Sequence, residues 1–111
     1  MLLDAALRIV QVNPAFCEIT GYAAEEVLVR KPSMLGSGRH DRAFFRELLA
    51  TLAAAGRWQG EVWNRRKDGD LYVQWMSAVR IGEADAPEGF VATMTDITSR
   101  KQTEEKLRFR A

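Results

Sequence analysis

Few residues of this 111-residue chain are of the types that carry enzyme chemistry. It has one cysteine, Cys17, and one histidine, His40, too few for an intrachain disulfide, a cysteine-based zinc site or a catalytic metal centre. The paired carboxylates Glu25–Glu26 and Glu104–Glu105 fall in helix-favouring polar stretches, where acidic side chains normally face water. The sequence contains no glycine-rich phosphate loop and no nucleophile motif. It therefore predicts a domain that is not itself an enzyme.

A second kind of chemistry is the binding of a ligand with a flat, apolar ring and a hydrogen-bonding edge. Such a ligand needs aromatic walls and a polar side chain aimed at its edge. Trp58, Asn64 and Trp75 are of these types, and we expect them on adjacent strands. The alternative is that Asn64 closes a hairpin and the two tryptophans fill the core.

Composition and charge limit the partners. Apolar residues make up 47% and charged residues 28% of the chain, as is usual for one globular domain. The formal charge of +1 gives no basic surface for nucleic acid. The apolar runs are far shorter than a membrane span, and the N-terminus does not resemble a signal peptide. We expect a cytoplasmic segment without membrane contact, cut from a longer protein that could itself be membrane-anchored.

The first half of the chain predicts short elements. Leu7–Val12 has the β-branched residues of a strand and ends at a proline, which cannot donate to a ladder. Pro14–Thr20 is predicted to be a helix capped by Asn13 and ended by Gly21. Ala23–Leu28 predicts a second short helix, and the segment 32–38 predicts a loop or a single turn.

The second half predicts one longer helix and three strands. Apolar residues at three- and four-residue spacing predict a helix over Arg42–Ala55, capped by Asp41. Two strands, 58–67 and 70–81, meet at Asp68-Gly69, a hairpin signal. Along the second, Leu71, Val73, Trp75 and Ser77 face one way and Tyr72, Gln74, Met76 and Ala78 the other. A polar loop over 82–89, a strand over 90–95 and a charged helix after Ile97 complete an α+β pattern with an antiparallel sheet.

Five short motifs in this order resemble those of PAS sensory domains: Asn13–Phe16, Ile19–Tyr22, Gly60–Glu61, Asn64–Gly69 and Asp96–Thr98. The resemblance covers nearly the whole chain and agrees with the predicted element order. It implies the PAS fold, a five-stranded antiparallel sheet with short helices on one face, a small cavity and a C-terminal exit helix. Residues 1–98 would form the domain and 99–111 the start of a linker to an output domain.

The resemblance also suggests a cofactor. Arg57–Lys67 looks like the corresponding strand of redox-sensing PAS domains that bind FAD, in which the matching tryptophan and asparagine approach the isoalloxazine. Trp58, Asn64 and Trp75 are therefore the candidate flavin site. The light-oxygen-voltage members carry an adduct-forming cysteine in the segment that here reads Arg30–Gly36, which has none. Cys17 lies on an earlier helix and is expected to be a small buried hydrophobe, so we expect no photoadduct.

The resemblance also suggests haem as an alternative cofactor. His40 with Asp41 resembles the pair that opens the long helix in oxygen-sensing haem PAS domains, and His40 would be the axial ligand. Those proteins place an arginine over the distal face, whereas this chain has Gly60 near the matching position. The alternative is that His40 is a solvated surface residue.

The segment Asp96–Thr98 is expected to carry a signal outward. Asp96 or Thr98 can cap the exit helix, and in the family Asp96, Ile97 and Thr98 match a motif linked to signal relay. Ile97, Leu107 and Phe109 are too few to bury that helix in its own domain, which favours a homodimer through it.

These features favour a sensory domain of a bacterial signalling protein. It would relay a change in its cavity or its dimer contacts to a covalently linked diguanylate cyclase or histidine kinase. The alternative function is a ligand-free dimerisation or interaction module. A cavity filled by apolar side chains (Met34, Phe45, Trp58, Trp75 and Met94) favours that alternative, whereas a roomy cavity with Asn64 unpaired favours a small-molecule ligand.

Overall fold

The sheet is the frame of the molecule. The structure, a computed structural model, describes the backbone of residues 1–110 and the side chains of residues 1–107. Its five antiparallel strands lie in the order β2-β1-β5-β4-β3, which confirms the predicted α+β class and the PAS fold. The strands are β1 (Leu2–Asp4), β2 (Ile9–Gln11), β3 (Arg57–Arg65), β4 (Leu71–Glu83) and β5 (Ala86–Asp96).

Two of the helices begin and end where local signals predict. In α1 (Pro14–Thr20) the Asn13 side chain accepts the Phe16 N–H at 2.9 Å. In α3 (Arg42–Ala55) the Asp41 carboxylate accepts the Phe44 N–H at 2.9 Å, and Gly56 ends the helix at a φ of 82°. A side chain would strain this left-handed conformation, so glycine is the residue that fits. The other helices are α2 (Ala24–Val27), the 3-10 turn η1 (Pro32–Leu35) and α4 (Thr98–Arg110).

Two expected segments differ. The expected strand Leu7–Val12 is shorter, because β2 covers only Ile9–Gln11; Leu7, with a φ of 66°, lies in the tight turn that joins β1 to β2. The expected polar loop over 82–89 is wrong, because β4 and β5 pair from Glu83–Ala86 onward and enclose a two-residue turn. A register shift at Ile81/Gly82 takes up the irregularity. Cross-strand pairing at an exposed sheet end tolerates polar residues, so polarity alone was misleading.

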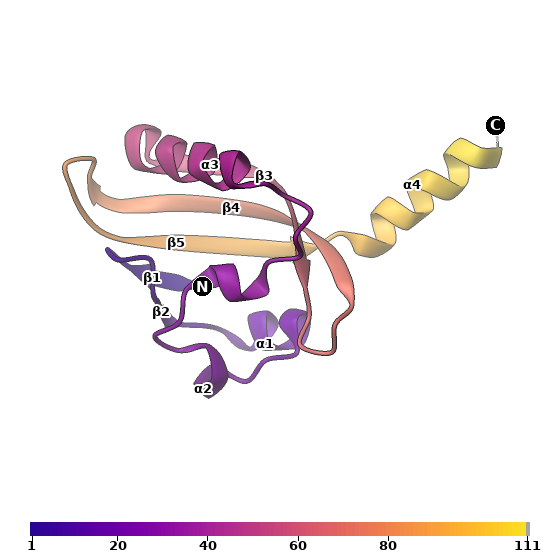
Figure 1. Ribbon diagram of the computed structural model, residues 1–111, viewed down its shortest axis with the longest axis horizontal. Helices are drawn as coiled ribbons and strands as arrows, with labels where there is room; N and C mark the ends of the chain where they lie inside the picture. The colour runs from indigo at the N-terminus through magenta and orange to yellow at the C-terminus, as the bar shows by residue number, and fades with distance from the viewer. Residues whose placement is uncertain (111) are drawn as a thin grey trace.

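One face of the sheet is covered and the other is open. Residues from α1, α2, η1 and α3 share a core with the inner sheet face, including Phe16, Val27, Leu35, Leu52 and Ala78. Figure 1 shows α3 lying along the long strands and α4 leaving the body of the domain. Within residues 1–110, no helix is long and apolar enough to cross a membrane.

Candidate functional site

An apolar cavity of about 320 Å³ lies between the inner sheet face, α3 and the Pro32–Gly36 segment. Its size falls near the lower end of the usual range for ligand pockets, roughly 300–1,000 Å³. Most of its wall is apolar, from the sheet and from α3: Leu3, Val62, Met76, Phe90, Ala92 and Met94, and Phe45, Leu48, Leu49 and Leu52. The cavity therefore has room for a small ligand, which is the first of the two features that were expected to favour one.

Two buried amides face this cavity from neighbouring strands. Gln74 of β4 is 2% exposed, and its Oε1 has no hydrogen-bond partner among the described residues. Asn64 of β3 is 7% exposed. With its amide nitrogen turned towards the acceptors, it donates at 3.2 Å to the carbonyl oxygens of Leu35 and Trp63. Of the two amides, the one with an unpaired atom is thus Gln74, which sequence reasoning missed, although the alternation of β4 already placed it beside Met76.

The two tryptophans do not form the expected walls. Trp75 pairs with Glu61 and Thr95 on the outer face of the sheet and is 43% exposed. Consecutive strand residues face opposite sides, so Trp75 and Gln74 cannot both face the cavity. Trp58 is half-buried against the core, and its ring covers Gly60 so closely that a Cβ there would lie 2.8 Å from it. Of the three residues expected to hold a flavin, only Asn64 lines the cavity in the described chain.

His40 is not placed to bind haem. Its Nε2 accepts the Trp63 N–H at 2.9 Å, and its ring stacks on Phe44 with centroids 3.9 Å apart. Burial lowers the pKa of His40, the Arg39 charge lowers it further, and Asp41 opposes both. His40 is half-buried, its Nε2 is already hydrogen-bonded, and it is not among the described residues that line the cavity. We therefore do not assign it as a haem ligand. The alternative, a freely solvated side chain, does not fit this position either.

Cys17 lies on α1, partly buried against the core cluster. The described residues that line the cavity do not include it. The segment where light-oxygen-voltage proteins carry their cysteine forms η1, and Pro32, Ser33 and Gly36 from it contribute to the cavity wall. No photoadduct is expected from this arrangement, because a thiol must lie next to the ring that it attacks.

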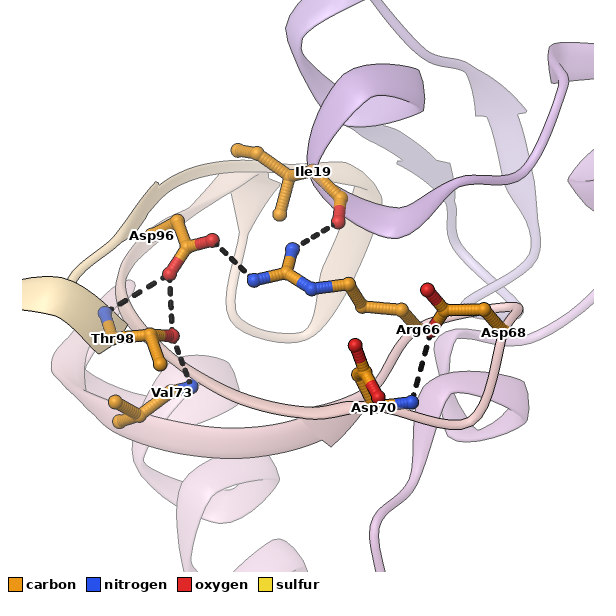
Figure 2. Close-up of polar contacts among 7 residues, drawn as sticks. All are labelled: Ile19, Arg66, Asp68, Asp70, Val73, Asp96 and Thr98. Atoms are coloured by element: carbon orange, nitrogen blue, oxygen red, sulfur yellow. Dashed lines mark hydrogen bonds and ion pairs between the residues drawn. The ribbon is translucent and has the colours of Figure 1, made fainter.

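Asp96 and Thr98 of the expected relay are tied into one network, drawn in Figure 2. Asp96 Oδ2 accepts from Arg66 at 2.6 Å, and Arg66 also donates to the carbonyl oxygen of Ile19 at the end of α1. Asp96 Oδ1 accepts the Thr98 N–H at 3.0 Å and the Thr98 hydroxyl at 2.6 Å. The Thr98 hydroxyl in turn accepts the Val73 N–H of β4 at 3.1 Å. One carboxylate therefore joins α1, the β3–β4 hairpin and α4.

Charge and burial shape the hairpin end of this network. Burial alone would raise the pKa of Asp96, but hydrogen bonds from Thr98 and Arg66 lower it overall. Arg66 lies over the ring of the fully buried Tyr72, 4.4 Å from its centroid. Burial raises the pKa of Tyr72 against the opposing effects of Asn64 and Arg66. Asp96 is thus held ionised and Tyr72 neutral.

The exit helix is anchored mainly at its first turns. The Ile97 N–H donates to the Val73 carbonyl oxygen at 3.0 Å, and Lys101 pairs with Glu61 of β3 at 2.9 Å. Beyond these contacts Leu107 is 62% exposed. The side chain of Phe109 and all of Ala111 lie outside the described residues.

A model of the PAS domain family matches residues 1–99. The chain belongs to the PAS family. The nitrogen fixation regulatory protein of Klebsiella oxytoca is 32% identical over 108 residues, which is 96% of this chain and 22% of that protein. The blue-light-activated histidine kinase 1 of Erythrobacter litoralis is 33% identical over 94 residues, 81% of this chain and 25% of that protein.

A solved structure has the same fold. The crystal structure of the PAS domain of a protein from Colwellia psychrerythraea superposes with a TM-score of 0.80 at 24% identity, over 88% of this chain and 84% of that one. The chain spans only about a fifth to a quarter of the length of these curated relatives. The PAS domain is accordingly homologous to sensory modules of larger regulatory proteins and histidine kinases.

Proposed function

We propose that this PAS domain senses the occupancy or chemical state of a ligand in its cavity and relays it to α4. The observation that carries the proposal is the position of Val73. Its neighbour Gln74 lines the cavity, while both backbone polar groups of Val73 are bonded to the start of α4, through Ile97 and Thr98. We therefore expect a shift of β4 at Gln74 to change the contacts at the start of the exit helix.

We further propose that the ligand is a flavin, with FAD as the candidate. The buried, unpaired Oε1 of Gln74 requires a donor, and the imide edge of a flavin has an N–H of that kind. Gln74 and Asn64 would hold this edge, and the apolar wall would enclose the ring. When bound, the flavin supplies one- or two-electron redox chemistry. This assignment keeps Asn64, replaces Trp75 by Gln74 and leaves Trp58 in a supporting position.

The protein's own part in the relay is mechanical. A new hydrogen bond at Gln74 would pull β4 towards the cavity and change the bonds that Val73 makes to Ile97 and Thr98. Asp96 would transmit the change, since it caps α4 and binds the hairpin through Arg66. The exit helix would then shift between two packings, biased by whatever occupies the cavity.

The proposed output is a covalently linked histidine kinase or diguanylate cyclase. The first is favoured by the histidine kinase among the relatives, and the second by the sequence of the exit helix. We place the protein in the cytoplasm as a homodimer that associates through α4, where Leu107 is exposed.

The second candidate function is a ligand-free dimerisation module. The outer sheet face favours it, because Trp75, Val79 and Ile81 are exposed there on β4. An exposed apolar face of this kind is typical of a surface that contacts another chain.

The first test is an absorption spectrum of protein purified without refolding, followed by mass spectrometry of the molecule that heat releases. Bands near about 370 and about 450 nm support flavin, and a colourless released metabolite supports a different ligand. A blank spectrum with nothing released supports the dimerisation module.

The second test concerns the relay in the full-length protein. Asp96→Ala should abolish regulation of the output while the domain stays folded. Asp85→Ala, in the exposed β4–β5 turn, is the matched control and should leave regulation intact. Unchanged regulation in the Asp96→Ala protein would contradict the proposed relay.

A further inference from the structure

Trp63 is held on the open edge of the sheet by a short loop. β3 is an edge strand, so polar backbone groups that point away from β4 need other partners. At Trp63 the N–H donates to His40 Nε2 at 2.9 Å, and the carbonyl oxygen accepts from the Ser37 hydroxyl at 2.8 Å. The Arg39 guanidinium lies over the indole ring, 3.9 Å from its centroid. We call these contacts of Ser37, Arg39 and His40 the Trp63 clasp.

The clasp continues directly into the wall of the cavity. The preceding residues, Pro32–Gly36, line the cavity in part, and Gly36 forms a bridge with Asn64. The Asn64 amide also donates to the Leu35 carbonyl oxygen at 3.2 Å. The position of this wall over the two cavity amides therefore depends on contacts made on either side of Trp63.

The hydrogen bond at His40 exists in only one protonation state. To accept the Trp63 N–H, Nε2 must carry a lone pair, so the neutral ring has its proton on Nδ1. Protonation would turn Nε2 into a donor that faces another donor. The loop brings the charges of Arg39 and Asp41 to the ring. The uncharged rings of Phe44 and Phe45 face it from α3, and β3 contributes the Trp63 backbone.

We propose that His40 is a proton-sensitive latch: in its neutral form it fastens the Pro32–His40 segment to β3, and its protonation releases that wall of the cavity. This property is separate from the identity of the ligand and from the relay through Asp96.

The direction of the response follows from the surroundings of the ring. Burial and the Arg39 charge lower the pKa of His40 below its ordinary value of 6.5. The hydrogen bond from Trp63 acts in the same sense, because it stabilises the neutral ring. The latch is therefore closed at neutral pH and opens on acidification through the lowered pKa. A pH-dependent access to the cavity would follow in the sensor.

The test follows backbone amide hydrogen exchange at Trp63 and across 36–41, in the ligand-free chain, between about pH 7.5 and about pH 5. Corrected for intrinsic exchange, the Trp63 amide should exchange at least about fivefold faster in acid, since one hydrogen bond is lost. Nitrogen NMR of the His40 ring should show the Nδ1–H tautomer at neutral pH.

Two variants separate the latch from general acid loosening. His40→Gln keeps an acceptor that does not titrate, so exchange at Trp63 should stay slow over the whole range. His40→Lys places a permanent donor there, so exchange should be fast throughout. The proposal is overturned if His40 in the unmodified chain titrates without changing exchange at Trp63, or if its neutral ring carries the proton on Nε2. Neither result depends on a bound ligand, so the proposed sensing function is judged separately.

Discussion

The ion pair between Arg66 and Asp96 should couple the hairpin to the exit helix measurably. We would replace Arg66 by Met and Asp96 by Asn, singly and together. Met keeps an unbranched stem over the Tyr72 ring, and Asn keeps the oxygen that caps Thr98. The Arg66→Met change also removes the bond to the Ile19 carbonyl oxygen, and it does so whether residue 96 is Asp or Asn. The loss of that bond therefore cancels in the double-mutant cycle.

The expected size follows from geometry and exposure. Fully exposed pairs contribute about 0.2–1 kcal/mol, whereas hydrogen bonds to charged groups contribute about 1.5–3 kcal/mol. The two side chains are 24% and 28% exposed and 2.6 Å apart. The Arg66–Asp96 pair is intermediate between an exposed ion pair and a buried hydrogen bond to a charged group. We therefore expect a coupling energy of about 1 to 1.5 kcal/mol at low salt.

The assay is urea unfolding followed by tryptophan fluorescence at neutral and acidic pH. The pKa of Asp96 is lowered from 3.8 in the folded chain. Its contribution to the free energy of unfolding is therefore present above that value and is lost as the pH falls through the lowered, folded pKa. A coupling energy below about 0.3 kcal/mol at neutral pH, within the usual scatter for independent sites, would refute the reasoning.

Three further variants test other parts of the structure. Gln74→Leu should raise the free energy of unfolding of the ligand-free protein by about 1 kcal/mol, because it removes an unpaired buried carbonyl; destabilisation in urea unfolding would show that the carbonyl is satisfied. Gly89→Ala should lower the melting temperature, since its Cβ would lie 2.5 Å from the Leu3 carbonyl oxygen, at a cost of about 1–3 kcal/mol. Trp75→Phe should leave the affinity for FAD unchanged in calorimetric titration, whereas a tenfold loss of affinity would show that Trp75 contributes to the binding site.

Local signals were sufficient for α1 and α3. Asp41 and Gly56 enclose α3 at the bounds that the spacing of its apolar residues predicts, because caps and glycine stops act within a few residues. The hairpin turn at Asp68-Gly69 was predicted for the same reason. The strand ends around Glu83 and Ala86 were not, since their pairing depends on the partner strand rather than on local preference.

The site was less predictable because its residues are joined by contacts distant in the sequence. The alternation of β4 separated Trp75 from Gln74 correctly, but periodicity alone does not say which of two apolar faces is covered. The odd-numbered face also contains the buried Val73, so both sides looked like core. The bond from Trp63 to His40 spans 23 residues, and no local rule predicts it. Asn64 was identified because a resemblance supplied its context.

The loop contacts at the two edges of the sheet also limit how copies of the chain can associate. At β3, Ser37 and His40 occupy both outward backbone groups of Trp63. At β2, Ile9 is bonded on its outer side to Val29 and Arg30. At these two positions a second copy could not add a strand to the sheet without first displacing a loop. Such end-to-end growth is the route by which open edges seed fibrils, so these loops act as guards against polymerisation.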